Sequence, residues 1–146
     1  DTAPTSSVFS IGTEWGSGAV LVAYCFADIN GYQKIGSWTG NSNANGPIIY
    51  TGFKPAFIMS KNSNRNENWL IHDNKRGTIN VNQTKLSPND TSAESTNAAF
   101  ALDFLSNGFK IRTTDTALNQ TGEVYAYLAI AEAPLVGSNN IPATAR

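Results

Sequence analysis

Short runs of alternating apolar and polar residues, separated by turn sequences, constrain the fold of this chain most. A period of two residues is typical of a β-strand with one face in a core, and no segment has the i, i+3, i+4 spacing of a sustained amphipathic helix. The ten candidate strands are Val8–Ile11, Val20–Ile29, Tyr32–Trp38, Ile48–Thr51, Ala56–Lys61, Asn68–Asp73, Thr78–Val81, Ala98–Phe104, Gly108–Arg112 and Glu123–Glu132. Turn sequences such as Asn30-Gly31 and Ser106-Asn107-Gly108 separate nearly all of them. The pattern predicts an all-β fold, an antiparallel β-sandwich of lectin-like or jelly-roll-like type, with about ten short strands and little helix.

The best helical candidate is Thr91–Ala99, which starts with the capping-box sequence Thr91-Ser92-Ala93-Glu94. We expect one helical turn there at most.

The chain also contains an internal sequence repeat, which we call the echo. Val8–Ile11, a polar loop and Val20–Asp28 resemble Gly108–Ile111, a polar loop and Val124–Glu132, about a hundred residues later. Each copy is expected to be a closing hairpin. We therefore predict an N-terminal hairpin in residues 1–29, which resembles the end of a preceding repeat and packs on a main sandwich domain of residues 30–135, in cis or by pairing with a neighbour. Residues 136–146 are expected to form a C-terminal tail.

The second strand of each copy is apolar on both faces. In the later copy Val124, Ala126, Leu128 and Ile130 face one way, and Tyr125, Tyr127, Ala129 and Ala131 face the other. A strand of this kind belongs at the centre of a sheet, covered by another layer or by a neighbouring chain. The single cysteine, Cys25, lies in the earlier copy, where we expect a buried, inert thiol.

Composition excludes several classes of partner. The 146 residues carry a formal net charge of −1, with 14% charged and 40% hydrophobic residues, as expected for one folded domain. Lysine and arginine form no stripe that could follow a phosphate backbone, so nucleic acid is not expected as a partner. No apolar run reaches the length of a bilayer span, so we expect no membrane insertion.

Because the chain opens at Asp1 without a methionine or a signal peptide, we expect a processed product or an excerpt of a longer protein.

Residue chemistry gives no catalytic site. The sole histidine, His72, is expected at the surface or a rim, and no Gly-x-Ser-x-Gly sequence supplies a nucleophile. Six acids could form a glycosidase pair, but most are expected to be solvated at strand ends; they are Glu67, Asp73, Glu94, Asp103, Asp115 and Glu132. We therefore predict a protein that is not an enzyme and needs no cofactor. Calcium stays open as an alternative at Asp73-Asn74, Asn89-Asp90 and Asp103, whereas zinc is excluded with one cysteine and one histidine.

Aromatic residues are the better candidates for a binding site. The residues that would suit the stacking of a sugar ring are Trp15, Tyr24, Tyr32, Trp38, Tyr50, Trp69, Tyr125 and Tyr127. Of these, the predicted site residues are Trp15, Tyr32, Trp38 and Trp69. For Trp38 and Trp69 the competing interpretation, which we favour, is a place in the core. Trp15 lies in a predicted loop, where it would serve as a contact residue or an interface anchor.

Several segments resemble one known family. They are Val22–Phe26, Gly31–Asn41, Gly46–Phe57, Asn68-Trp69, Asp73–Arg76, Leu102–Lys110 and Tyr127–Pro134. In the same order along most of the chain, they are similar to repeat domains of surface proteins in marine bacteriophage virions, of the tail-fibre, spike or capsid-decorating type.

The resemblance implies a β-sandwich on the surface of a phage particle, often in tandem copies and in trimeric assemblies, without enzymatic activity. The expected function is a structural or adhesion module whose partners are copies of itself, other virion proteins and a host-surface glycan. The alternative is a lectin-like carbohydrate-binding module of a secreted or viral protein. A hydrolase of surface polysaccharide is a third hypothesis. Tail and capsid locations are both open.

Overall fold

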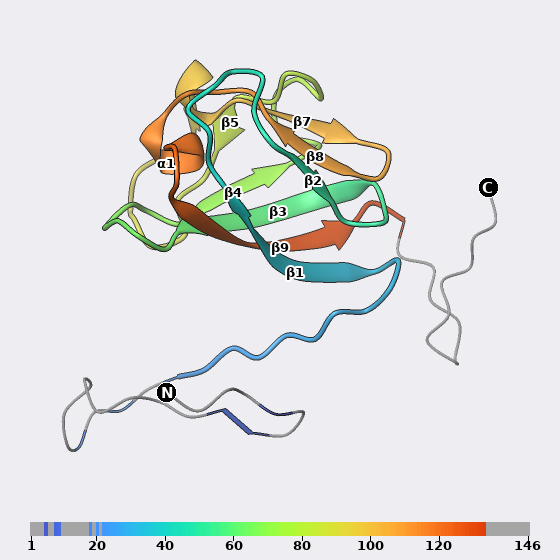
Figure 1. The fold of residues 1–146 in the computed structure, drawn as a ribbon, viewed down its shortest axis with the longest axis vertical. Coiled ribbons are helices and arrows are strands. Elements are labelled where there is room, and N and C mark those ends of the chain that lie inside the picture. The colour runs from blue at the N-terminus through green and yellow to red at the C-terminus, as the bar shows by residue number, and fades with distance from the viewer. Residues whose placement is uncertain (1–4, 6–7, 10–17, 19, 21, 134–146) are drawn as a thin grey trace.

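The structure, a computed structural model, describes residues 5, 8–9, 18, 20 and 22–133. Nearly all of the regular structure is β-strand, which confirms the predicted all-β fold (Figure 1). The elements in chain order are β1 (Gln33–Thr39), β2 (Ile48–Tyr50), β3 (Pro55–Asn62), β4 (Leu70–Asp73), β5 (Thr84–Lys85), β6 (Ser95–Thr96), η2 (Ala98–Phe100), β7 (Leu102–Leu105), β8 (Gly108–Ile111), α1 (Thr116–Asn119) and β9 (Val124–Ala131). No helix in this part of the chain is long and apolar enough to span a bilayer.

The strands form two main antiparallel sheets (Figure 1). One sheet has the order β1-β9-β3-β4 and the other the order β2-β8-β7, while β5 and β6 pair in a small third sheet. Apolar side chains from both main sheets form one buried cluster, as in a β-sandwich. The outer face of the four-stranded sheet points away from this core.

An aromatic cluster joins the two main sheets. Trp38 of β1 stacks on Tyr125 of β9, with ring centroids 5.0 Å apart and planes 10° from parallel. Phe109 of β8 meets Trp38 edge-on at 5.7 Å and Tyr127 at 5.3 Å. Aromatic pairs in these geometries contribute roughly 0.5–1.5 kcal/mol each beyond their burial. The indole N–H of Trp38 donates to the carbonyl of Leu118 at 3.1 Å, so its one polar atom is satisfied in the core.

Six of the predicted strands are confirmed, with ends shifted by one or two residues: β1, β2, β3, β4, β8 and β9. The predicted hairpin at Ser106-Asn107-Gly108 is also confirmed, because β7 and β8 pair with Leu105 opposite Gly108. The position of β9 between β1 and β3 confirms that this strand is central in its sheet.

One other predicted strand is confirmed only in its second half, and one is wrong. Ala98–Phe104 splits into η2 and β7, because the side chain of Asn97 accepts from Ala99 N and begins a short helix six residues after Thr91. Thr78–Val81 is not a strand, since the Thr78 hydroxyl bonds to the Val81 carbonyl and closes a local turn.

The earlier copy of the echo differs most from expectation. Its described residues, Val8, Phe9, Val20 and residues 22–28, lie in no strand, whereas strands were predicted over Val8–Ile11 and Val20–Ile29. The rest of the predicted first strand lies outside the described residues. The later copy is not a hairpin, because β8 belongs to the three-stranded sheet and β9 to the four-stranded sheet. The echo is therefore a similarity of sequence, and only its later copy contributes one strand to each main sheet.

Candidate functional site

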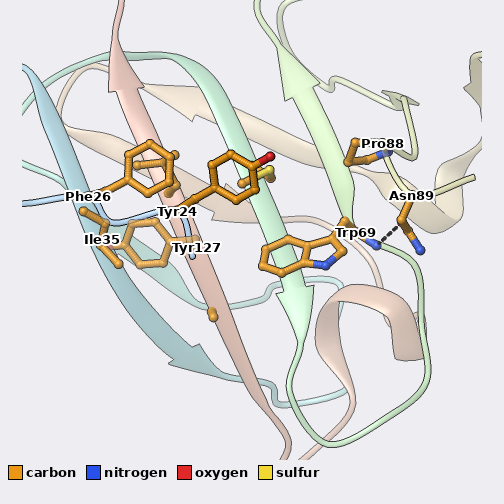
Figure 2. Close-up of a pocket in the computed structure, with 10 residues that line it drawn as sticks. Tyr24, Phe26, Ile35, Trp69, Pro88, Asn89 and Tyr127 are labelled. Atoms are coloured by element: carbon orange, nitrogen blue, oxygen red, sulfur yellow. Dashed lines mark hydrogen bonds between the residues drawn. The ribbon is translucent and has the colours of Figure 1, made fainter. Parts of the chain in front are cut away.

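An apolar groove of about 610 Å³ lies on the outer face of the four-stranded sheet (Figure 2). Its floor is formed by Ile35, Met59, Ala126 and Leu128, and Tyr127 also borders it. Tyr24 and Phe26 form one side, and Trp69, Pro88 and Asn89 form the other. No Asp, Glu, Lys, Arg or His is among these residues, so the groove presents an uncharged, largely apolar surface.

Strand register explains the floor. Ile35 of β1 is opposite Leu128 of β9, Leu128 is opposite Met59 of β3, and Met59 is opposite Ile71 of β4. Directly opposed residues point to the same face of a sheet, so these four side chains form one apolar row across all four strands. The alternate residues of β9, among them Tyr125, point into the sandwich core.

One side of the groove is a segment that we call the strap, residues 22–28. It ends at a turn in which Ile29 bridges to Gln33. Next to that bridge, side-chain hydrogen bonds take the place of the backbone ladder of a hairpin. The Asp28 carboxylate accepts from Ile35 N at 2.7 Å, and the Gln33 side-chain amide donates to the Ala27 carbonyl. The backbone groups that would continue the ladder are thereby occupied, and the strap turns across the outer face of the sheet.

The strap exposes its apolar side chains. Tyr24 is 82% exposed, Phe26 53% and Val22 77%. Cys25 is exposed as well, so the prediction of a buried thiol is wrong. The reason is that the strap lacks strand partners among the described residues and leaves both of its apolar faces without a covering layer.

The opposite side of the groove is built on a polar scaffold. Trp69 N donates to the Asn89 side-chain oxygen at 2.9 Å (Figure 2), and the Asn89 amide donates to the Asn68 side chain at 3.0 Å. Asn68 in turn donates to the Asp90 carboxylate at 3.1 Å. Hydrogen bonds from Ser92 hold the pKa of Asp90 below its ordinary value, so this acceptor stays ionised. The network orients Trp69, whose side chain is left 37% exposed beside the groove.

A family model matches residues 1–134, which include both the strap and the sheet. The chain belongs to the DUF7483 family, a domain of unknown function. No curated protein and no solved structure matches it.

The structure separates the aromatic candidates of the DUF7483 domain. Trp69 lies at the groove and is partly exposed, so the preferred interpretation of this residue as core is wrong, while its role in binding stays a prediction. Trp38 is 6% exposed inside the aromatic cluster, which makes it a core residue and excludes it as a ligand contact. Tyr32 lies in the turn before β1, away from the groove, where its carbonyl accepts from Ala131 N at 2.8 Å. Trp15 lies outside the described residues.

Tyr24 belonged to the wider set of aromatic candidates but not to the four predicted site residues, and Phe26 and the floor residues Ile35 and Met59 belonged to neither. A signal for the floor was nevertheless present. The outward-facing half of the β9 sequence is as apolar as its inward-facing half, which predicted a covering layer over both faces. Among the described residues the strap and the loop with Pro88 and Asn89 border the outer face, and they cover it incompletely.

His72 is fully buried, contrary to the predicted surface or rim position. The alternation of buried and partly buried residues along β4 places His72 on the inner face of the strand. Its Nε2 lies 3.0 Å from the carbonyl oxygen of Phe100. Burial lowers the pKa of His72 to about 4, so the ring is neutral at physiological pH. Its Nδ1 has no hydrogen-bond partner within the described ranges. The histidine is a core residue rather than a rim base.

Most of the acidic candidates are held by basic or backbone partners. Arg76 bonds to both Asp73 and Glu94. Asp103 pairs with Arg112 at 3.2 Å, and Glu132 pairs with Lys54 at 2.6 Å. The hydrogen bond from Lys54 lowers the pKa of Glu132, which therefore stays ionised and lacks the raised pKa of a general acid. Asp115 caps α1 by accepting from Ala117 N, and Glu67 borders a small polar cavity.

The segments proposed for calcium use their oxygens within the protein. Asn89 and Asp90 belong to the scaffold under Trp69, and the Asp73 carboxylate accepts from Lys75 N and from Arg76. Asn74 donates its amide to Glu132 at 2.8 Å. In the described part of the chain no three His, Cys, Asp or Glu side chains are grouped so that they could hold a metal ion.

Proposed function

We propose that the DUF7483 domain is a non-enzymatic structural and adhesion module on the surface of a bacteriophage virion, in a tail fibre, a spike or a capsid decoration. The observation that carries the binding role is the apolar groove beside the exposed side chains of Tyr24 and Phe26. Contiguous exposed apolar surface of this kind marks interaction sites in soluble proteins. The resemblance to phage repeat domains supports the proposed location on the virion surface.

The partners are copies of the same chain, assembled as a trimer, together with neighbouring virion proteins and a host-surface glycan. The groove supports a protein partner because its lining has no ionised side chain, and depletion of charge is typical of the centre of a protein–protein interface. Its aromatic side chains, Tyr24, Phe26 and Trp69, belong to the residue types enriched there.

Location is tested by labelling purified virions of the encoding phage with an antibody raised against the recombinant domain. The proposal expects gold label on intact particles, at the tail or on the capsid. A matched antibody against an intracellular phage protein controls for debris. Label that is confined to lysate and absent from particles contradicts a virion role.

A lectin-like module is the second candidate, and Trp69 favours it. The indole is partly exposed at the groove, and an aromatic side chain at the edge of an apolar pocket suits the stacking of a sugar ring. Binding on a glycan array that is lost in Trp69→Ala and kept in Tyr50→Ala, an exposed aromatic of β2 outside the groove, would establish it. An array without any bound glycan, or equal signals from the two variants, would exclude the groove as a sugar site.

A further inference from the structure

Lys85 is a buried cation in the part of the sandwich where β4, β5, η2 and α1 meet. The residue is 9% exposed, although lysine is almost never fully buried without a partner. Its ammonium donates to the Ser87 hydroxyl at 2.7 Å and lies 5.1 Å from the centre of the Phe100 ring.

No carboxylate in the described residues forms an ion pair with Lys85. A hydroxyl and an aromatic face stabilise an ammonium only in part, since neither carries a neutralising charge. Burial of a charge without a counter-ion is costly, so the site as it stands favours the arrival of an anion.

A cavity of about 180 Å³ provides the place for such an anion. Lys85 and Phe100 border it, together with Asn66, Glu67, Asn68, Leu70 and Ala117. The cavity shares no lining residue with the outer groove. It therefore combines a cation, an aromatic ring, the amide of Asn66 and the carboxylate of Glu67 in one small, open cavity.

We propose that this cavity binds a small carboxylate-bearing ligand, of the class of an acidic sugar. The carboxylate would pair with the Lys85 ammonium, the ring of Phe100 would contact a C–H face, and Asn66 would hydrogen-bond to a hydroxyl. Glu67 borders the same cavity and opposes a bound anion, so it limits the affinity. The site is separate from the groove, and its test does not depend on how the groove functions.

The experiment is a titration of the ¹⁵N-labelled full chain with glucuronate, followed by amide chemical shifts, with glucose as the neutral control. The proposal expects saturable shifts at residues 66–68, 70 and 85 with glucuronate, none at the groove residues Tyr24 and Met59, and none with glucose. Loss of one charge-assisted contact lowers affinity by about tenfold, so Lys85→Met is expected to bind at least about tenfold more weakly. Lys110→Met, the same change on the remote strand β8, is expected to bind like the wild type.

Glu67→Gln separates a ligand site from an internal ion pair. If the cavity takes an anion, removal of the opposing carboxylate tightens the binding of glucuronate. If Glu67 is instead the counter-ion of Lys85 in solution, Glu67→Gln lowers the midpoint of thermal unfolding and the wild type shows no saturable shifts. That result, or wild-type affinity in Lys85→Met, overturns the proposal. Lys85→Gln, which keeps a donor toward Ser87, replaces Lys85→Met if the latter does not fold.

Discussion

Buried asparagines hold the loops of this protein in place. Asn62, Asn82 and Asn119 are each fully buried, and each uses its amide as a local hub. The Asn119 amide donates to the carbonyls of Asn43 and Thr113 at 2.8 and 2.7 Å, while its oxygen accepts from Asn41 N at 2.8 Å. A buried polar side chain with satisfied partners is stabilising mainly because its removal leaves those partners unpaired.

Asn119→Ala is therefore expected to lower the free energy of unfolding by about 3 kcal/mol, since several buried backbone groups lose their partner. Urea denaturation followed by tryptophan fluorescence measures the change. Asn45→Ala, at an exposed loop position, is the matched control, with an expected change within about 0.5 kcal/mol. Equal losses in the two variants would show that burial of the amide is unimportant.

His72 makes stability depend on pH. Its pKa is about 4 in the folded protein and 6.5 as an ordinary value, so the unfolded chain binds the proton more readily. Stability is complete above pH 6.5 and falls as the pH drops toward 4. Between pH 7.5 and 5 the free energy of unfolding is expected to fall by about 2 kcal/mol, because a pKa difference of one unit corresponds to about 1.36 kcal/mol.

Urea denaturation at both pH values measures this loss. Because the chain has a single histidine, His72→Gln, which keeps a donor for the Phe100 carbonyl, should flatten the profile in this window. A profile that His72→Gln leaves unchanged would assign the pH dependence to other groups.

At the scale of elements, patterning predicted the sheets better than it predicted the segment beside them. The two apolar faces of β9 correctly indicated a central strand. The same pattern in Val20–Asp28 gave a wrong strand, because pairing needs an available edge, and the side chains of Asp28 and Gln33 occupy the edge of β1 next to it. No sequence period reveals that competition.

The smallest elements escaped prediction for a different reason. β5 and β6 have two residues each, which is too few to show any period. α1 is one turn fixed by the Asp115 cap and by buried Leu118. In the site, Trp69 was among the predicted residues, but its partners across the groove come from the strap, and their proximity depends on a turn geometry that alternation does not encode.

Asp28→Ala is expected to release the strap from the sheet. The Ile35 N–H loses its carboxylate acceptor, and its hydrogen exchange should accelerate by about tenfold, the equivalent of one charge-assisted bond. Amide exchange followed by NMR measures the rate at Ile35. Glu94→Ala, which removes a partly exposed acid elsewhere, should leave the rate at Ile35 unchanged. A rate at Ile35 that Asp28→Ala does not alter would mean that the strap is held by other contacts.

At the scale of the whole molecule, the sandwich separates a tightly packed interior from an incompletely covered outer face. The aromatic cluster fills the core between the sheets, whereas the groove and the strap leave large apolar side chains exposed to water. The echo adds to this view, since the strap has the sequence of a central strand but no strand partners among the described residues. A second copy that covers the groove would bury both, which is why self-association is central to the proposed function.

Sedimentation of the purified chain tests this claim most directly. The wild type is predicted to sediment as a trimer. The double variant Tyr24→Ser/Phe26→Ser is predicted to sediment as a monomer, because it removes the aromatic side of the groove. Ile48→Ser/Tyr50→Ser is the matched control, since these β2 side chains are 65% and 67% exposed outside the groove, and it should keep the wild-type mass. A monomeric wild type, or a groove variant with an unchanged mass, would contradict the claim.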